Sequence, residues 1–309
     1  MRYVHPEAQA FLDATSQAVP LDLLSPDENW ANQLKGSADW GAKIKLASVP
    51  DTTIAGVEVR VYVPIDVELE PGSTAGPAFI YFHGGGWVLG DLDTNDSTVR
   101  DIADGTGMIC ISVHYRRAPE NPFPAPLEDC LAVVDEVLAG ESGLQIDPNL
   151  VAIGGDSAGG NIAAEIAQER REQIVHQVLI YPVLNLSTFD TASHDEFADG
   201  YFLTRRRLTY FYDSYAGGHD RSNVRMSPGL NDQLTGLPPA TIITAECDPL
   251  VSEVSDYAER MLKAGNTVSA IEFKGQVHPF LQMGGAISDA QVARRMISAE
   301  LRHALKEKK

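Results

Sequence analysis

One segment of the chain carries a nucleophile in a setting that suits acyl transfer. Ser157 is the centre of a Gly-x-Ser-x-Gly pattern that directly follows the apolar run 151–153 and precedes a helical pattern starting near Gly159. A serine on a tight turn between a strand and a helix has an accessible hydroxyl, and the helix N-terminus favours developing negative charge. A glycine-rich helix start or a phosphate loop is the alternative, although no lysine follows as in a P-loop. The pattern therefore predicts Ser157 as a nucleophile.

A second segment has the composition of an oxyanion-binding loop. His83 is followed by three glycines, directly after the apolar run 78–82. Glycines let backbone N–H groups point at one spot, where each donor stabilises the charged carbonyl oxygen by about 3 kcal/mol. We predict that Gly84 and Gly85 donate, together with the N–H of Ala158. A flexible turn is the alternative for the glycines. We expect His83 to brace this loop rather than to act as a base.

The acid and the base should follow the serine in the order acid, then histidine. His278 lies in the loop after the last apolar run, where a base should sit, and Asp248 follows the apolar run before it. Glu246 is the rival acid, because it lies two residues earlier at the same predicted strand end. We predict that His278 takes the serine proton and that Asp248 orients the imidazole.

These segments need a scaffold, and the pattern of the chain predicts one. Seven short apolar or alternating runs are typical of strands in a sheet, most of them buried on both faces as in a parallel sheet. The runs are 56–63, 78–82, 108–113, 151–153, 178–181, 240–245 and 269–273. Helical patterns lie between them, at 94–105, 126–139, 159–170, 253–264 and 289–306. This alternation predicts an α/β fold with a sheet covered by helices.

Two stretches interrupt the alternation. Residues 1–40 predict two short helices, 6–18 and 27–37, and residues 186–236 form an insertion with one helical piece near 204–215. Together they could form a helical cap over the site, while surface padding is the alternative for the insertion. We predict N-terminal cap helices in residues 1–40, and a catalytic domain in residues 41–309 that carries the cap insertion.

Composition excludes several classes of function. The formal net charge of the 309 residues is −19, which argues against a nucleic-acid partner and disfavours anionic membranes. No run reaches the ~18 apolar residues of a membrane span, and the first thirty residues lack the apolar core of a signal peptide. The three cysteines have neither metal nor redox spacing and fit a reducing compartment. We expect a cytoplasmic protein.

The chain resembles the hormone-sensitive-lipase family of esterases, the bacterial family IV carboxylesterases. The likeness runs from about residue 78 to about residue 282 and rests on four segments in the right order. These are His83-Gly84-Gly85-Gly86-Trp87, Tyr115-Arg116-Arg117-Ala118-Pro119-Glu120, Gly155-Asp156-Ser157-Ala158-Gly159-Gly160, and Asp248-Pro249-Leu250 with His278. The third segment is similar to the elbow of the family's larger, aspartate-containing subgroup, which makes Asp156 a supporting residue of the site.

The resemblance implies an α/β-hydrolase fold with a mostly parallel eight-stranded sheet and a cap. It implies a serine carboxylesterase for small-molecule, short-chain acyl esters, with no metal and no cofactor, and often a homodimer. The same catalytic residues would serve an amidase, a lactonase or a carbamate hydrolase. A non-catalytic small-ligand receptor is a remote alternative, because the plant gibberellin receptors of this family have lost the histidine that His278 matches.

Two sets of side chains have uncertain roles. Aromatic residues are candidate walls of a substrate pocket, although each could equally be an ordinary core residue. Those singled out are Trp87, Phe202 and Tyr215, with Phe189, Tyr201 and Phe211 as further candidates. The consecutive arginines 205–207 suggest either a site for a ligand carboxylate or a solvated helix face, and we expect the latter.

Overall fold

The computed structural model describes residues 2–35, 40–65, 67 and 75–306. Residues 1, 36–39, 66, 68–74 and 307–309 of the predicted domains lie outside the described residues, and they include Ser37, the predicted end of the second helix. Within the described residues, the chain folds around one sheet of eight strands in the order β1-β2-β4-β3-β5-β6-β7-β8. The strands from β4 to β8 are parallel, whereas β1 and β2 are antiparallel additions at one edge. The predicted mostly parallel eight-stranded sheet is therefore confirmed.

The strands largely follow the predicted runs. Their bounds are β1 Asp51–Ile54, β2 Val57–Tyr62, β3 Gly76–Phe82, β4 Ile109–Val113, β5 Ile146–Asp156, β6 His176–Ile180, β7 Ala240–Cys247 and β8 Val268–Val277. The apolar runs did not predict β1, because its first three residues are polar and exposed at the sheet edge. Its pairing is supported by Arg60 of β2, which donates to Asp51 at 2.7 Å.

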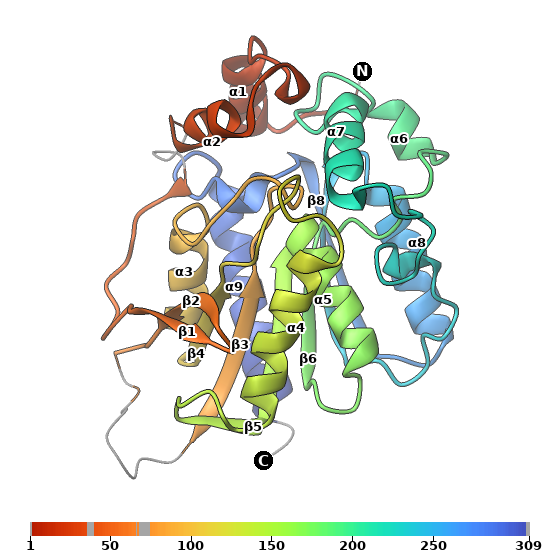
Figure 1. Ribbon diagram of the computed structural model, residues 1–309. Helices are drawn as coiled ribbons and strands as arrows, with labels where there is room; N and C mark the ends of the chain where they lie inside the picture. The colour runs from red at the N-terminus through yellow and green to blue at the C-terminus, as the bar shows by residue number, and fades with distance from the viewer. Residues whose placement is uncertain (1, 36–39, 66, 68–74, 307–309) are drawn as a thin grey trace.

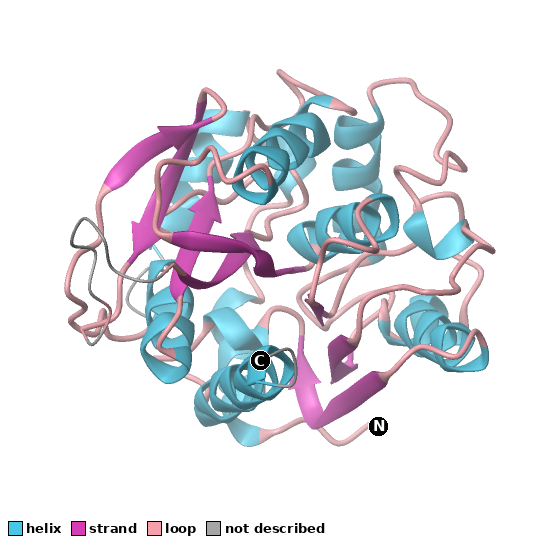
Figure 2. Cartoon of the chain, turned by 90° about the horizontal axis from the view of Figure 1, so that it is seen from below, coloured by secondary structure: helices cyan, strands magenta, loops and turns pink. Residues whose placement is uncertain are grey.

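Helices cover both faces of the sheet (Figures 1 and 2). Helices α3 and α9 pack together on one face, and α4, α5 and α8 lie on the other. Their bounds are α3 Asp96–Thr106, α4 Ala125–Leu138, α5 Ala158–Glu169, α8 Val251–Lys263 and α9 Ser288–Lys306. Each of these helices coincides within a few residues with a predicted helical pattern.

The alternation along β3 shows why such strands appear as continuous apolar runs. Phe79 and Tyr81 belong to the core on the side of α3 and α9, while Ile80 and Phe82 belong to the core on the side of α4 and α5. Successive side chains of a strand point to opposite faces, and here both faces are covered. All four are fully buried, so the run must be apolar throughout.

A third group of helices lies above the sheet in Figure 1. It comes from two distant parts of the chain: α1 Pro6–Thr15, the 3-10 helix η1 Leu21–Leu23 and α2 Pro26–Lys35, and, after β6, α6 Ala192–Glu196 and α7 Arg205–Ala216. The later segment also contains η3 Pro228–Leu230, and η4 Phe280–Gln282 follows β8. Arg206 of α7 donates to Asp22 of η1 at 2.7 Å, which ties the two parts together.

Candidate active site

Ser157 occupies a strained turn between β5 and α5. Its φ is 55° and its ψ is −116°, a backbone conformation that L-residues rarely adopt. The turn is tight because α5 begins against the end of β3: a Cβ on Gly159 would overlap the carbonyl oxygen of Phe82. The N–H of Ser157 donates to Ile180 of β6 at 2.9 Å, which fixes the turn to the neighbouring strand. The serine side chain therefore stands at the end of the sheet, above the helix N-terminus.

The structure brings Ser157, His278 and Asp248 into one hydrogen-bonded chain. The Nε2 atom of His278 lies 2.9 Å from Oγ of Ser157, and its Nδ1 atom lies 2.7 Å from Oδ2 of Asp248. Since a carboxylate can only accept, Nδ1 carries the proton and Nε2 is free to accept the serine proton. The other carboxylate oxygen of Asp248 accepts the N–H of Leu250 at 2.9 Å, which holds the carboxylate in place. This arrangement can activate a hydroxyl.

The rival acid Glu246 points away from His278. Its carboxylate accepts the N–H of Gly275 at 2.8 Å and lies 3.5 Å from Arg2 and 3.4 Å from Lys274. These partners hold the pKa of the Glu246 carboxyl below its usual range even though burial opposes the shift. Glu246 therefore belongs to a surface ion-pair cluster at the end of β7 and β8.

The glycine loop differs from the prediction at one position. The N–H of Gly84 donates to Oδ1 of Asp156 at 2.8 Å, so it is not available to a substrate oxygen. Gly85 and Gly86 instead line the cavity beside Ser157. Ala158 is the first residue of α5, and the first N–H groups of a helix have no partner within it. The structure therefore speaks against Gly84 as a donor, and Gly86 becomes a candidate beside Gly85 and Ala158.

The carboxylate of Asp156 accepts three hydrogen bonds that hold the glycine loop in place. It accepts from the Tyr81 hydroxyl at 2.6 Å, from Gly84 at 2.8 Å and from Nε2 of Gln282 at 2.6 Å. Complete burial raises the pKa of the Asp156 carboxyl, and these donors oppose that shift. Asp156 thus connects β3, the glycine loop and η4. Neither Tyr81 nor Gln282 was singled out from the sequence, where nothing marks them apart from their neighbours.

His83 lies under the same loop as a neutral ring. Its Nδ1 donates to the Gly84 carbonyl at 2.9 Å, and the ring stacks on Tyr115 at 4.2 Å between centroids. The Tyr115 hydroxyl in turn donates to the His83 carbonyl at 2.7 Å. Burial lowers the pKa of His83 to about 3, so the ring stays uncharged at neutral pH. These contacts are consistent with the expected role of His83 as a structural support for the glycine loop.

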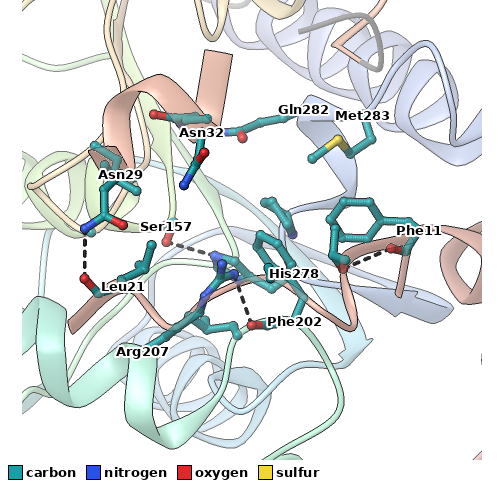
Figure 3. Close-up of a pocket in the computed structure, with 18 of the residues that line it drawn as sticks. Phe11, Leu21, Asn29, Asn32, Ser157, Phe202, Arg207, His278, Gln282 and Met283 are labelled. Atoms are coloured by element: carbon teal, nitrogen blue, oxygen red, sulfur yellow. Dashed lines mark hydrogen bonds between the residues drawn. The ribbon is translucent and has the colours of Figure 1, made fainter. Parts of the chain in front are cut away.

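A cavity of about 740 Å³ opens at Ser157 and His278. Its walls come from α1, η1 and α2, from the segment 202–211, from the glycine loop and from η4, and most lining residues are apolar. Figure 3 shows Phe11, Leu21, Phe202 and Met283 among the residues that line this cavity with Ser157. Among parallel α/β sheets, the carboxyl ends of the strands are the usual place for such a site.

The aromatic residues predicted as pocket walls lie in different places. Phe202 lines the cavity, as does Phe211. Trp87 and Tyr215 do not line it: they stack on each other at 4.1 Å between centroids and are fully buried. The prediction for these two residues is therefore corrected. A strand-end aromatic next to glycines can face the core as easily as the cavity, and only the packing of α7 decides between the two.

The described residues contain neither a membrane-spanning helix nor a cluster of potential metal ligands. No helix there is long and apolar enough to cross a membrane. No group of three or more His, Cys, Asp or Glu side chains in the same part of the chain could hold a metal ion.

Comparisons with known proteins agree with this geometry. A family model described as the alpha/beta hydrolase fold matches residues 79–282. The carboxylesterase NlhH of Mycobacterium tuberculosis is 38% identical over 271 residues, which are 85% of this chain and 83% of that protein. An ethyl acetate hydrolase of Pseudomonas putida is 32% identical over 98% of this chain and 99% of its own length.

Solved structures are similar over nearly the whole chain. A thermostable esterase from Pseudomonas putida ECU1011 superposes with a TM-score of 0.89 at 32% identity, covering 99% of this chain and 98% of that one. A hyperthermophilic esterase from Pyrobaculum calidifontis superposes with a TM-score of 0.89 at 31% identity, covering 98% of this chain and 99% of that one. The sheet order, the strained serine turn and these relatives together show that the chain belongs to the α/β-hydrolase family, in its hormone-sensitive-lipase-like group of carboxylesterases.

Proposed function

We propose that the protein hydrolyses carboxylic esters, with Ser157 as nucleophile, His278 as base and Asp248 as orienting acid. The observation that carries this proposal is the continuous hydrogen-bonded chain from Oγ of Ser157 through both ring nitrogens of His278 to Asp248, in the wall of a mostly apolar cavity. The relatives, which are named esterases and carboxylesterases, support the ester as the bond that is cleaved.

The reaction runs in two halves. In the first, Oγ of Ser157 forms a bond to the acyl carbon while Nε2 of His278 takes the serine proton, and the proton passes to the departing alkoxide as the carbon–oxygen ester bond breaks. In the second, a water molecule gives a proton to Nε2 and its oxygen bonds to the acyl carbon. The serine oxygen then leaves and recovers that proton, which releases the carboxylic acid.

Charge on the acyl oxygen needs donors at the moment it develops. The N–H groups of Gly85, Gly86 and Ala158 are the set that the geometry favours: Gly85 and Gly86 line the cavity with Ser157, Ala158 follows Ser157 at the start of α5, and Gly84 is held by Asp156. Each such donor stabilises the transition state by about 3 kcal/mol.

We also propose the finer assignments. Residues 1–40 and 186–236 act as a cap, since their helices supply much of the cavity wall. Short acyl esters are the substrates, as the name of the Pseudomonas putida ethyl acetate hydrolase suggests for that relative. The protein works in the cytoplasm, where its three buried free cysteines would stay reduced. Two protomers pair through β8, which lies at the edge of the sheet.

Substitution of Ser157 by Ala tests the central proposal. We expect kcat for p-nitrophenyl butyrate to fall by a factor of about 10⁴ to 10⁶, because the nucleophile is lost. The circular dichroism spectrum should stay unchanged, which shows that the variant is folded. A panel of p-nitrophenyl esters from acetate to palmitate should give the highest kcat/KM at short chains. A loss of kcat below tenfold in the variant would refute the assignment of Ser157.

A further inference from the structure

Three consecutive arginines begin α7, and the structure gives them different environments. Arg205 pairs with Asp195 at 2.8 Å, and Arg206 pairs with Asp22 at 2.7 Å, both near the surface. Arg207 forms no salt bridge with any carboxylate in residues 2–35, 40–65, 67 or 75–306. The first two arginines therefore lie on a partly exposed face of the helix, in line with the expected solvated face, whereas the third does not.

Arg207 lines the cavity that contains Ser157 and His278, and Figure 3 shows its side chain among the residues around that opening. Its Nη1 donates to the Phe202 carbonyl at 3.2 Å, and its guanidinium carbon lies 4.2 Å from the centre of the Phe202 ring. A guanidinium carries five N–H donors, so this one bond leaves most of them for another acceptor. No other Lys or Arg lines the cavity within the described residues.

The environment makes an unpaired charge costly. Burial lowers the pKa of Arg207 to about 10, which still leaves the side chain positive at neutral pH. Taking a cation out of water without an anionic partner is unfavourable, whereas a bound anion offsets that cost. The cavity is otherwise largely apolar, so an anion that entered it would find its charge partner at Arg207.

The two acidic residues that line the cavity have other partners. Glu7 accepts from the N–H and the hydroxyl of Ser288 at 2.8 Å each. Asp156 is held by Tyr81, Gly84 and Gln282. Neither carboxylate forms a salt bridge with Arg207 in the described structure, so the charge at the cavity wall remains positive at this point.

We propose that Arg207 is a specificity-determining residue that binds a free carboxylate of the substrate, so that the preferred substrates are esters bearing a carboxylate in their acyl or alcohol part. A planar guanidinium can donate two parallel hydrogen bonds to the two oxygens of a carboxylate. A neutral ester has no negative charge to form this charge-assisted pair. This inference rests on the proposed esterase function and adds a substrate class to it.

Matched pairs of esters test this assignment. For the acyl side, kcat/KM is measured with p-nitrophenyl hydrogen glutarate and with its neutral methyl ester, each above the uncatalysed rate. For the alcohol side, 4-acetoxybutanoate is compared with 4-acetoxybutanamide. We expect the wild type to prefer the acid member of at least one pair, and that pair identifies the side on which the carboxylate binds.

Arg207→Met should lower kcat/KM for the preferred acid by about 10- to 100-fold, as expected when a charged hydrogen bond is lost. The same variant should change kcat/KM for the neutral ester by less than about threefold. Arg207→Lys keeps the charge and should retain part of the preference. Arg205→Met is the matched control: it removes a partly exposed arginine of the same helix that does not line the cavity and whose partner Asp195 lies in the same segment of the chain, and it should behave like the wild type with both esters.

The outcomes separate this inference from the proposed function. If the wild type hydrolyses neutral esters with no preference for either acid, the carboxylate site is refuted while the esterase function stands. If Arg207→Met slows the neutral and the acid ester equally, Arg207 only supports Phe202 and the inference is again refuted. If the folded wild type hydrolyses none of the esters, the proposed function fails and this inference fails with it.

Discussion

At the scale of single residues, two carboxylates at one strand end are separated by their surroundings. Glu246 and Asp248 lie two residues apart, yet only Asp248 reaches His278. The ladder between β7 and β8 shifts register between Ala245 and Cys247, so the chain leaves the regular strand geometry where the acid is needed. The Glu246 carboxylate instead accepts a hydrogen bond from the Gly275 N–H and forms ion pairs with Lys274 and Arg2.

Paired substitutions distinguish the two carboxylates. Asp248→Asn should lower kcat for p-nitrophenyl butyrate by about 10⁴-fold, because the amide no longer favours the imidazole tautomer that accepts the serine proton. Glu246→Gln is the control, and it should change kcat by less than about threefold. Both variants should keep the wild-type circular dichroism spectrum. A larger loss in the Gln variant than in the Asn variant would assign the acid to Glu246.

At the scale of elements, the buried carboxyl group of Glu253 links the start of α8 to the loop after β6. Oε1 of Glu253, in the first turn of α8, accepts the N–H of Leu184 at 2.7 Å. That loop leads into the segment carrying α6 and α7, so the contact anchors one end of the proposed cap. Burial raises the pKa of Glu253 to about 8, and the nearby Asp248 acts in the same direction.

The raised pKa predicts a pH-dependent stability. Between about pH 4.5 and pH 8 the folded protein keeps Glu253 protonated while the unfolded chain loses that proton, so the free energy of unfolding should fall as pH rises. Glu253→Gln cannot ionise, and its amide oxygen can still accept the Leu184 N–H. Relative to wild type, its free energy of unfolding should rise by roughly 1.4 kcal/mol for each pH unit in this window.

Urea unfolding at several pH values between 5 and 8 measures this difference. The control is Glu259→Gln, which removes a carboxylate on the exposed face of the same helix, where Glu259 pairs with Lys263 at 2.6 Å. The control should follow the wild-type slope. Parallel curves for wild type and Glu253→Gln would show that Glu253 is ionised in the folded state across the whole window.

At the scale of the whole molecule, two features act against each other. The strand β8 is an edge of the sheet, and residues 268–272 of this strand are partly or fully exposed. Such an edge can pair with a second copy of itself. The net charge of −19 opposes that association, since two protomers repel each other over the Debye length, about 10 Å at 0.1 M salt.

The proposed dimer should therefore depend on salt. Light scattering should give twice the protomer mass at micromolar concentration in about 0.3 M NaCl, and a larger monomer fraction at about 0.02 M, where repulsion is poorly screened. The esterase activity provides a check that the protein is intact in both buffers. A protomer mass at every salt and protein concentration would refute pairing through β8.

Much of this fold follows from short-range patterns. Seven of the eight strands overlap predicted runs. The central strands are apolar at nearly every position because both of their faces are covered, whereas β2 was marked by its alternation. The Gly-x-Ser-x-Gly setting, the order along the chain and the places at strand ends singled out Ser157 and His278, whereas Asp248 and its rival Glu246 both satisfied that order. The edge strand β1 escaped prediction because its first three residues are polar and exposed, and its pairing with β2 is a feature of the fold rather than of the local pattern.

The remaining features depend on contacts between residues far apart in the chain. Gly84 and Gly86 are equivalent by type, and the carboxylate of Asp156, 72 residues later, decides which N–H is free. Arg205, Arg206 and Arg207 are identical neighbours, yet one turn of helix directs the first two to surface carboxylates and the third into the cavity. Sequence patterns specify residue types and element periods, whereas the partner of a buried polar group is fixed only when distant elements pack.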